Sequence, residues 1–153
     1  MPRTLEEIEA LATIDPEFAK ALEQAPPLPN ITEYAPHDVR LGAKAFAKQL
    51  AEANPVDPAS ILVEHITIPA RDQYPIPARL YKPATSATGQ SPLVVIFHGG
   101  GYVLGGPENE ELACRSYVKE LGVIVVNVDY RLAPEFPFPC GPYDAWDSVK
   151  WVR

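Results

Sequence analysis

The residues best suited to chemistry lie in the segment HGGGYVLGG, residues 98–106, which follows a run of apolar residues. Most of these positions are glycine, so much of the backbone has no side chain to shield it from a ligand. Exposed backbone N–H groups can hold a phosphate, or the negative oxygen that develops during acyl transfer. The segment therefore has three interpretations: a phosphate cradle, a purely structural turn and an oxyanion hole.

The glycine spacing does not match the two common phosphate-binding motifs. The P-loop pattern G-x-x-x-x-G-K-[ST] would use Gly101 and Gly106, but Pro107 stands where the lysine is required. The dinucleotide pattern G-x-G-x-x-G would begin at Gly99, but Leu104 takes the place of the third glycine. A phosphate site is therefore the least favoured interpretation, whereas the structural turn and the oxyanion hole both stay open on this evidence.

Two apolar strands and a helix surround the glycine segment. The runs PLVVIFH (92–98) and VIVVNVDY (123–130) are almost continuously apolar, which predicts strands buried on both faces of a parallel sheet. Between them, ENEELACRSYVKELG (108–122) has helical spacing, with Gly122 as its C-terminal stop. A strand, a helix and a second strand of this length predict a parallel β-α-β unit.

An antiparallel strand pair is predicted before that unit, and a helix after it. ILVEHITIP (61–69) and IPARLYKP (76–83) are joined by a short polar link. Because a parallel crossover needs a dozen residues or more, the short link favours antiparallel pairing. The proline-rich residues 131–142 predict a loop, and YDAWDSVKWVR (143–153) predicts the start of another helix.

The first third of the chain predicts three helices. Thr4 and Glu7 fit a capping box, and Asp15 followed by Pro16 is a second helix start. A longer helix is expected from about residue 36 to 53, ended by a proline after Asn54. The apolar stripe expected on this helix consists of Val39, Ala43, Phe46 and Leu50.

Charge and composition restrict the partners and the compartment. With 13 basic and 20 acidic side chains the formal net charge is −7, which disfavours binding to nucleic acid or to an anionic membrane surface. We expect no secretory signal, because the first residues lack an apolar core, and no membrane span, because the apolar runs are short. Cys114 and Cys140 make neither a disulfide framework nor a metal-spaced cluster. These features favour a cytoplasmic protein and give no sign of a metal-binding cluster, and they leave the oligomeric state open.

Three segments in order carry a resemblance to a known family: HGGGYVLGG, then VDYRLAPEFPFP (128–139), then YDAWDSVKWV (143–152). Together they resemble the hormone-sensitive-lipase-like branch of the α/β-hydrolases, which comprises carboxylesterases and lipases. The resemblance implies the α/β class and a partial α/β-hydrolase sheet, in which the antiparallel pair precedes the parallel unit. By the same resemblance, residues 1–58 form a helical cap-like segment and residues 59–153 the N-terminal half of the core.

The resemblance also implies roles for the glycine segment. The backbone N–H groups of Gly99 and Gly100 would form the oxyanion hole, and Gly101 would let the loop turn. His98 would brace the loop by hydrogen bonding without acting as the catalytic base. Tyr102 would form a wall of the pocket for a small-molecule ester, although a merely packed aromatic ring is an equal alternative.

Further positions either extend this pattern or depart from it. By the resemblance, Asp129, Arg131 and Glu135 would form a local network of ion pairs that shapes the loop after the second parallel strand. Asn109-Glu110 stands where relatives often carry a His-Asp pair, and Cys140-Gly141-Pro142 replaces a commoner run of small residues. Neither departure alters the oxyanion N–H groups.

The sequence lacks the covalent part of this machinery. α/β-Hydrolases use a serine in G-x-S-x-G, followed along the chain by an acid and a histidine. No histidine follows His98, and no serine lies in such a motif. The serines are Ser60, Ser86, Ser91, Ser116 and Ser148. We therefore expect a chain truncated before the nucleophile elbow, and no esterase turnover by this chain alone.

Two functional hypotheses follow. The first is the N-terminal fragment of a carboxylic ester hydrolase, which carries the oxyanion loop of an enzyme that works through an acyl-serine intermediate. The alternative is a non-catalytic module for small-molecule binding or interaction, derived from the same fold. The acyl preference of either depends on segments that the sequence does not identify.

Overall fold

The structure, a computed structural model, describes residues 4–27, 30, 33–55, 59–85 and 91–153. Its contacts form two compact units, Met1–Glu33 and Tyr34–Arg153. The helix predicted over 36–53 therefore groups with the sheet and not with the residues before it. The division predicted between residues 58 and 59 falls beside residues 56–58, which lie outside the described residues, and it stays a prediction.

The first unit contains helices α1 (Leu5–Leu11) and α2 (Pro16–Gln24). The predicted capping box is confirmed: the Glu7 backbone N–H donates to Thr4 Oγ1 at 3.1 Å, and the Thr4 N–H donates to Glu7 Oε2 at 3.0 Å. The carboxylate of Asp15 caps α2 by accepting two backbone N–H groups of the first turn. No residue of either helix is buried.

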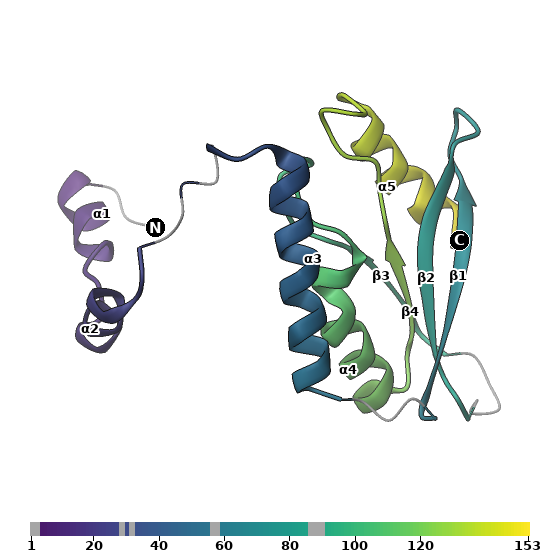
Figure 1. The fold of residues 1–153 in the computed structure, drawn as a ribbon, viewed down its shortest axis with the longest axis horizontal. Helices are drawn as coiled ribbons and strands as arrows, with labels where there is room; N and C mark the ends of the chain where they lie inside the picture. The colour runs from purple at the N-terminus through teal and green to yellow at the C-terminus, as the bar shows by residue number, and fades with distance from the viewer. Residues whose placement is uncertain (1–3, 28–29, 31–32, 56–58, 86–90) are drawn as a thin grey trace. The chain divides into compact units, whose positions relative to one another are not determined.

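The second unit is built on a four-stranded sheet whose order is β1-β2-β4-β3 (Figure 1). The strands are β1 (Ile61–Pro69), β2 (Pro75–Pro83), β3 (Leu93–Phe97) and β4 (Ile124–Val128). β1 and β2 pair antiparallel, with Ile61 opposite Pro83, and β3 and β4 pair parallel, with Leu93 opposite Ile124. Both predicted pairings are confirmed, and the antiparallel contact of β2 with β4 joins them into one sheet.

Four helical segments accompany the sheet: α3 (Pro36–Ala53), the 3₁₀ turn η2 (Pro107–Glu110), α4 (Glu111–Leu121) and α5 (Cys140–Trp151). Gly122 ends α4 in the left-handed conformation with φ 65°, as predicted for a C-terminal stop. α5 begins at Cys140, three residues before the predicted start. Pro142 lies in its first turn, where the missing N–H has no intrahelical acceptor to lose.

Side chains alternate across the sheet and supply two apolar layers. On one face, Val126 and Val128 of β4 pack in a cluster with Val152, which directly follows α5. On the other face, Val125 packs with Cys114 and Val118 of α4. Helices α4 and α5 therefore cover opposite faces of the sheet, as the nearly continuous apolar runs predict.

One burial prediction is wrong. β3 was expected to be buried on both faces, but Leu93 is exposed and the rest of the strand is only half-buried. Within the described residues β3 pairs only with β4, so it is an edge strand. In the apolar stripe predicted for α3, Phe46 is 66% exposed and Leu50 is also exposed, and α3 packs mainly against η2.

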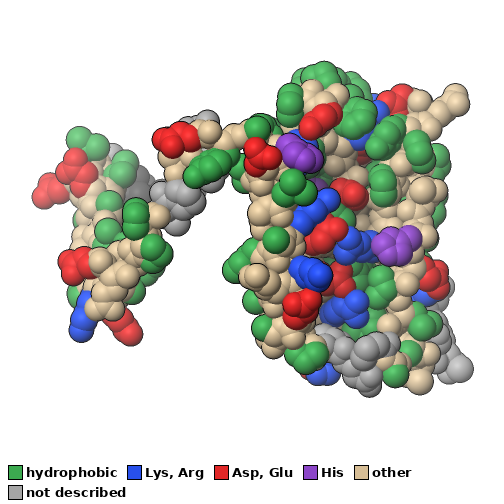
Figure 2. Space-filling view, viewed as in Figure 1, with side chains coloured by type: hydrophobic (Ala, Val, Ile, Leu, Met, Phe, Trp, Pro, Cys, Tyr) green, Lys and Arg blue, Asp and Glu red, His purple; other side chains and the backbone are tan. Residues whose placement is uncertain are grey.

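The visible surface of the second unit carries mixed charge. Figure 2 shows basic and acidic side chains interspersed on that face, without a continuous basic patch. Among the described helices, none combines the length and the apolar character needed to cross a bilayer.

Candidate functional site

The glycine loop begins where β3 ends, and it makes a tight turn. The carbonyl oxygen of Gly100 accepts the backbone N–H groups of Val103 at 3.1 Å and of Leu104 at 2.8 Å. Positive φ angles run through Gly100 (123°), Gly101 (59°) and Tyr102 (62°). A Cβ atom on Gly100 would lie 2.1 Å from the Leu104 carbonyl oxygen, so this turn requires glycine there.

The turn leaves two backbone donors unused. Gly99 and Gly100 are exposed, and no described residue accepts a hydrogen bond from either N–H group. Both glycines line a cavity of about 330 Å³. The lining residues are Phe97, His98, Gly99, Gly100, Gly101, Tyr102, Tyr130 and Ala145. The loop therefore lies beside a cavity whose volume would suit a small molecule.

His98 lies beneath the loop and is buried. Its Nδ1 nitrogen lies 2.8 Å from the Gly99 carbonyl oxygen, a hydrogen bond that requires the proton on Nδ1. The ring stacks on Tyr130 with centroids 4.3 Å apart, and the Tyr130 hydroxyl donates to the His98 carbonyl oxygen at 2.7 Å. The Nε2 nitrogen of His98 has no hydrogen-bond partner among the described residues. The end of β3 is thus joined to the residues after β4.

Tyr102 connects the loop to the residues that precede α5. Its carbonyl oxygen accepts the Ala133 N–H at 2.8 Å, and its half-exposed ring meets Tyr130 edge-on at 5.7 Å. Gly141 in the first turn of α5 lies close by. A Cβ there would be 2.8 Å from the Arg131 carbonyl oxygen and 3.1 Å from the Tyr102 ring. The close approach of α5 to the loop therefore depends on a bare Cα at position 141.

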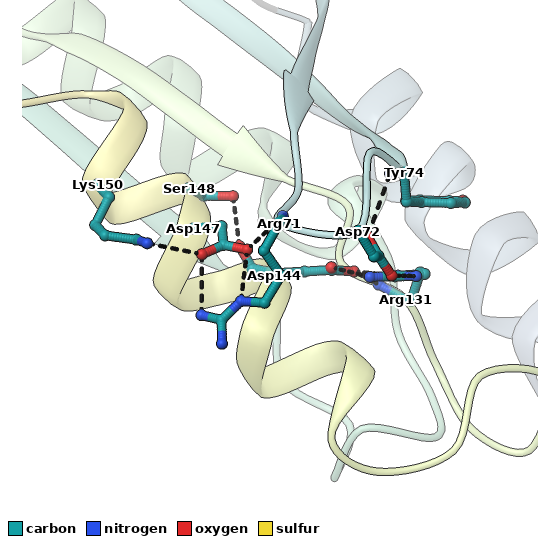
Figure 3. A network of polar contacts seen from close by, with 8 residues as sticks. All are labelled: Arg71, Asp72, Tyr74, Arg131, Asp144, Asp147, Ser148 and Lys150. Carbon is teal, nitrogen blue, oxygen red and sulfur yellow. Dashed lines mark hydrogen bonds and ion pairs between the residues drawn. The ribbon is translucent and has the colours of Figure 1, made fainter.

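Arg131 is held by carboxylates on two other segments (Figure 3). Its backbone N–H, Nε and Nη2 donate to the Asp144 carboxylate at 3.0, 2.9 and 2.6 Å, and its Nη1 donates to Asp72 at 2.7 Å. The Arg131 side chain is 7% exposed and that of Asp144 is fully buried. Hydrogen bonding to Asp144 raises the pKa of the Arg131 guanidinium above its ordinary value, so the guanidinium stays charged at any physiological pH.

A second ion pair lies one turn further along α5 (Figure 3). The Asp147 carboxylate accepts hydrogen bonds from the Arg71 backbone N–H at 2.8 Å and from the Arg71 side-chain nitrogens Nε and Nη2 at 3.0 Å. Lys150 Nζ lies 3.2 Å from Asp147 Oδ1. The hydrogen bond from Arg71 holds the pKa of Asp147 below its ordinary value. Asp147 thus joins α5 directly to the turn between β1 and β2, and Asp144 is joined to the same turn through Arg131 and Asp72.

The three residues expected to form one local network lie in separate environments. Arg131 pairs with α5 as described, and Glu135 pairs with Arg40 of α3 at 2.9 Å. No described residue makes a hydrogen bond or ion pair with the Asp129 carboxylate, whose pKa is raised by burial and partly lowered by the nearby His98. The expected network of direct contacts is therefore not what the structure contains, because each charge finds its partner elsewhere in the fold.

Sequence reasoning did not single out Arg40 or Asp144. A signal existed for Asp144: it and Asp147 recur at helical spacing among apolar residues of the predicted helix, so two carboxylates had to lie near its buried side. Arg40 gave no comparable signal, since a single arginine in an amphipathic helix is ordinary. The described residues contain no group of three His, Cys, Asp or Glu side chains placed to hold a metal ion.

Known proteins share this arrangement. A family model of the alpha/beta hydrolase fold matches residues 94–153. The solved structure of an esterase from Pyrobaculum calidifontis superposes with a TM-score of 0.70 at 38% identity, over 92% of this chain and 42% of that one. The chain has the N-terminal part of the α/β-hydrolase fold. Its sheet is a partial α/β-hydrolase sheet, and the resemblance inferred from the glycine loop and the segments after it is confirmed.

Curated relatives of this α/β-hydrolase chain agree. Esterase LipI of Mycobacterium tuberculosis is 36% identical over 143 residues, which are 91% of this chain and 41% of LipI. An arylesterase of Saccharolobus solfataricus is 33% identical over 140 residues, which are 92% of this chain and 44% of that enzyme. The α/β-hydrolase chain therefore spans about two fifths of the length of these relatives.

Proposed function

We propose that this chain supplies the oxyanion hole of a carboxylic ester hydrolase, formed by the backbone N–H groups of Gly99 and Gly100. One observation carries the proposal: the two N–H groups have no acceptor among the described residues, and they lie beside the cavity that the loop lines. A backbone donor kept free at an exposed turn is available to a ligand at no cost in internal hydrogen bonds.

The chemistry that suits these donors is acyl transfer. When a nucleophile attacks an ester, the carbonyl oxygen becomes negative, and preorganised N–H donors stabilise that charge by about 2.7–4 kcal/mol each. Hydrogen bonds from Val103 and Leu104 to the Gly100 carbonyl oxygen support this loop conformation, and donors that are already oriented need little reorganisation during the reaction. In this proposal His98 and its contacts brace the loop from below, and Tyr102 forms one wall of the substrate cavity.

The nucleophile of the proposed reaction is not in the printed sequence, which has no G-x-S-x-G motif and no histidine after His98. The chain alone is therefore expected to give no turnover of a short-chain p-nitrophenyl ester. A carboxylic ester is the proposed substrate because the relatives are an esterase and an arylesterase. A metal or a cofactor has no part in this mechanism.

A matched pair of substitutions at one position tests the oxyanion role. Gly99→Ala keeps the N–H group and adds a Cβ in open space, whereas Gly99→Pro removes the N–H group. Both are made in a fusion that continues the chain with the serine-bearing remainder of a related esterase. We expect Gly99→Pro to lower kcat for p-nitrophenyl butyrate by about 10²–10³-fold relative to Gly99→Ala. Equal kcat values for the two variants, both folded, would refute the proposal.

A further inference from the structure

Arg40 of α3 makes four hydrogen bonds to the two loops around the site. Its Nε donates to the Val103 carbonyl oxygen at 2.8 Å, in the glycine loop, and its Nη2 donates to the Ala133 carbonyl oxygen at 2.6 Å. Its Nη1 and Nη2 nitrogens also donate hydrogen bonds to the two carboxylate oxygens of Glu135, at 2.9 and 3.1 Å. The side chain is only 16% exposed although its charge lies on a largely exposed helix.

The guanidinium group has the shape for this task. Its planar fork presents five N–H donors in fixed directions, so one side chain can hold two carbonyl oxygens and a carboxylate at the same time. Charge-assisted bonds of this kind are about twice as strong as neutral ones. A lysine at the same position would keep the charge, but a single ammonium group cannot reproduce the fork.

The contacts join two loops that also touch directly. The Ala133 N–H donates to the Tyr102 carbonyl oxygen, while the Ala133 carbonyl oxygen accepts from Arg40. Arg40 thus lies across a joint between the glycine loop and the loop that follows β4. A glycine-rich backbone has many alternative conformations, and fixing the carbonyl of Val103 removes most of them.

We propose that Arg40 is a positioning residue, which holds the glycine loop in the conformation that keeps the N–H groups of Gly99 and Gly100 free. The inference rests on the proposed function for its catalytic meaning, but the hold on the loop can be measured without any activity. Arg40 contacts neither the loop's free donors nor the cavity of the glycine loop, and it acts through Val103 and Ala133.

The test compares the Arg40→Lys variant of the 153-residue chain with the parent, by amide hydrogen exchange measured with NMR. The informative amides are those of Val103, Leu104 and Ala133, whose hydrogen bonds define the loop and its joint. We expect their exchange to accelerate about tenfold or more in Arg40→Lys. The Gly122 amide, bonded to Val118 in the α4 cap at 3.0 Å, serves as an internal reference and should not change.

A control on the same helix is Lys48→Ala. That lysine is exposed, and its one ion-pair partner among the described residues is Glu52 one turn away, so the loop amides should keep the parent rates. Unchanged exchange at the loop amides in Arg40→Lys would overturn the inference. If Arg40→Lys does not fold, Glu135→Gln provides the test. The Glu135 side chain is half exposed, so the substitution should be tolerated. The loss of the charged acceptor of Arg40 must still accelerate exchange at the Val103, Leu104 and Ala133 amides.

Turnover separates a positioning role from general stability. In the serine-bearing fusion, Arg40→Lys should lower kcat about tenfold and leave KM unchanged, because the loop's donors act mainly on the transition state. Suppose that the loop amides exchange faster in Arg40→Lys but the two Gly99 variants are equally active. Arg40 would then still position the loop, and the oxyanion role would be refuted. If Gly99→Pro lowers kcat but the loop amides of Arg40→Lys exchange at the parent rates, only the positioning role of Arg40 would be refuted.

Discussion

Removal of the Asp144 carboxylate is expected to be the most damaging single change outside the glycine loop. In Asp144→Ala, the Arg131 guanidinium is left 7% exposed with Asp72 as its remaining carboxylate partner. The Arg131 backbone N–H and two of its side-chain donors lose their acceptors at the same time. The substitution therefore leaves the buried Arg131 charge with a single, half-exposed carboxylate partner among the described residues, and it creates a small cavity.

The magnitude follows from this geometry. Breaking a buried ion pair by deleting one partner costs about 3–5 kcal/mol. Because the carboxylate is fully buried and three donors lose it, we expect the upper part of that range, about 4 kcal/mol. A domain of this size has a total free energy of unfolding of about 5–15 kcal/mol, so the change removes a large share of it.

Urea unfolding provides the measurement. Both tryptophans of the chain, Trp146 and Trp151, lie in α5 beside the pair, so their fluorescence reports on that helix, while circular dichroism reports on the whole chain. The shift of the midpoint at unchanged slope gives the loss in free energy of unfolding.

Two comparisons make this prediction refutable. Asp147→Ala deletes a carboxylate that is also buried, at 5% exposed, but its partners Arg71 and Lys150 reach water, so we expect only about 1–2 kcal/mol. Arg131→Met combined with Asp144→Leu removes both charges and should recover most of the loss. The reasoning is refuted if Asp144→Ala lowers the free energy of unfolding no more than Asp147→Ala does. It is also refuted if the double variant is as unstable as Asp144→Ala, because the buried Arg131 charge would then not be the cause of the instability.

Three further outcomes are expected. Gly100→Ala should lower the free energy of unfolding by about 1–3 kcal/mol, because φ is 123° and the new Cβ would meet the Leu104 carbonyl oxygen; urea unfolding measures this. Burial raises the pKa of the Cys114 thiol to about 12, so iodoacetamide at pH 8 should alkylate only Cys140 in the folded chain, as mass spectrometry would show. Hydrogen bonding lowers the pKa of Asp147, so its stabilisation is complete above the ordinary value of 3.8 and is lost as the pH falls through the lowered value; Asp147→Asn should flatten the acid limb of stability against pH.

Each of these outcomes has its own control. Gly99→Ala adds its Cβ in open space and should be nearly neutral, and a Gly100→Ala chain of equal stability would contradict the strain argument. In denaturing urea both cysteines should react, and fast labelling of Cys114 in the folded chain would contradict its burial. For Asp147→Asn, an acid limb parallel to that of the parent would contradict the lowered pKa.

The elements of the fold could be predicted because their signals are local. A proline at residue 36 and the pair Asn54-Pro55 bound one helix, and the short link after residue 69 allows only an antiparallel return. Such signals act within a few residues of the structure they determine. The same holds for the glycine loop, whose conformation depends on residue types that have no Cβ.

Burial could not be predicted from the same patterns. The apolar runs of β3 and β4 look alike, yet within the described residues β4 lies between two strands and β3 pairs with one. An apolar run shows that a strand needs neighbours, but the run does not encode whether the neighbours are present. The exposure of Phe46 in α3 has the same explanation. The spacing of the apolar residues predicts a stripe along the helix, but it does not indicate which element covers that stripe.

The charge pairings could not be predicted because they join residues far apart in sequence. Arg131 lies close in sequence to Asp129 and Glu135, yet its partners are Asp144 and Asp72, which lie 13 and 59 positions away. Proximity along the chain favoured the wrong acids. Only the packing of α5 against the turn between β1 and β2 brings the correct ones together.

The contact between Gly141 and Tyr102 has a consequence for how this chain can evolve. Tyr102 occupies a left-handed conformation that is costly for a residue with a side chain, and its ring lies against the bare Cα of Gly141. A larger residue at position 141 would push into that ring, so the two positions are not free to vary independently. Among homologues, an aromatic residue at the first position should co-occur with glycine at the second, and a departure at one should be matched at the other.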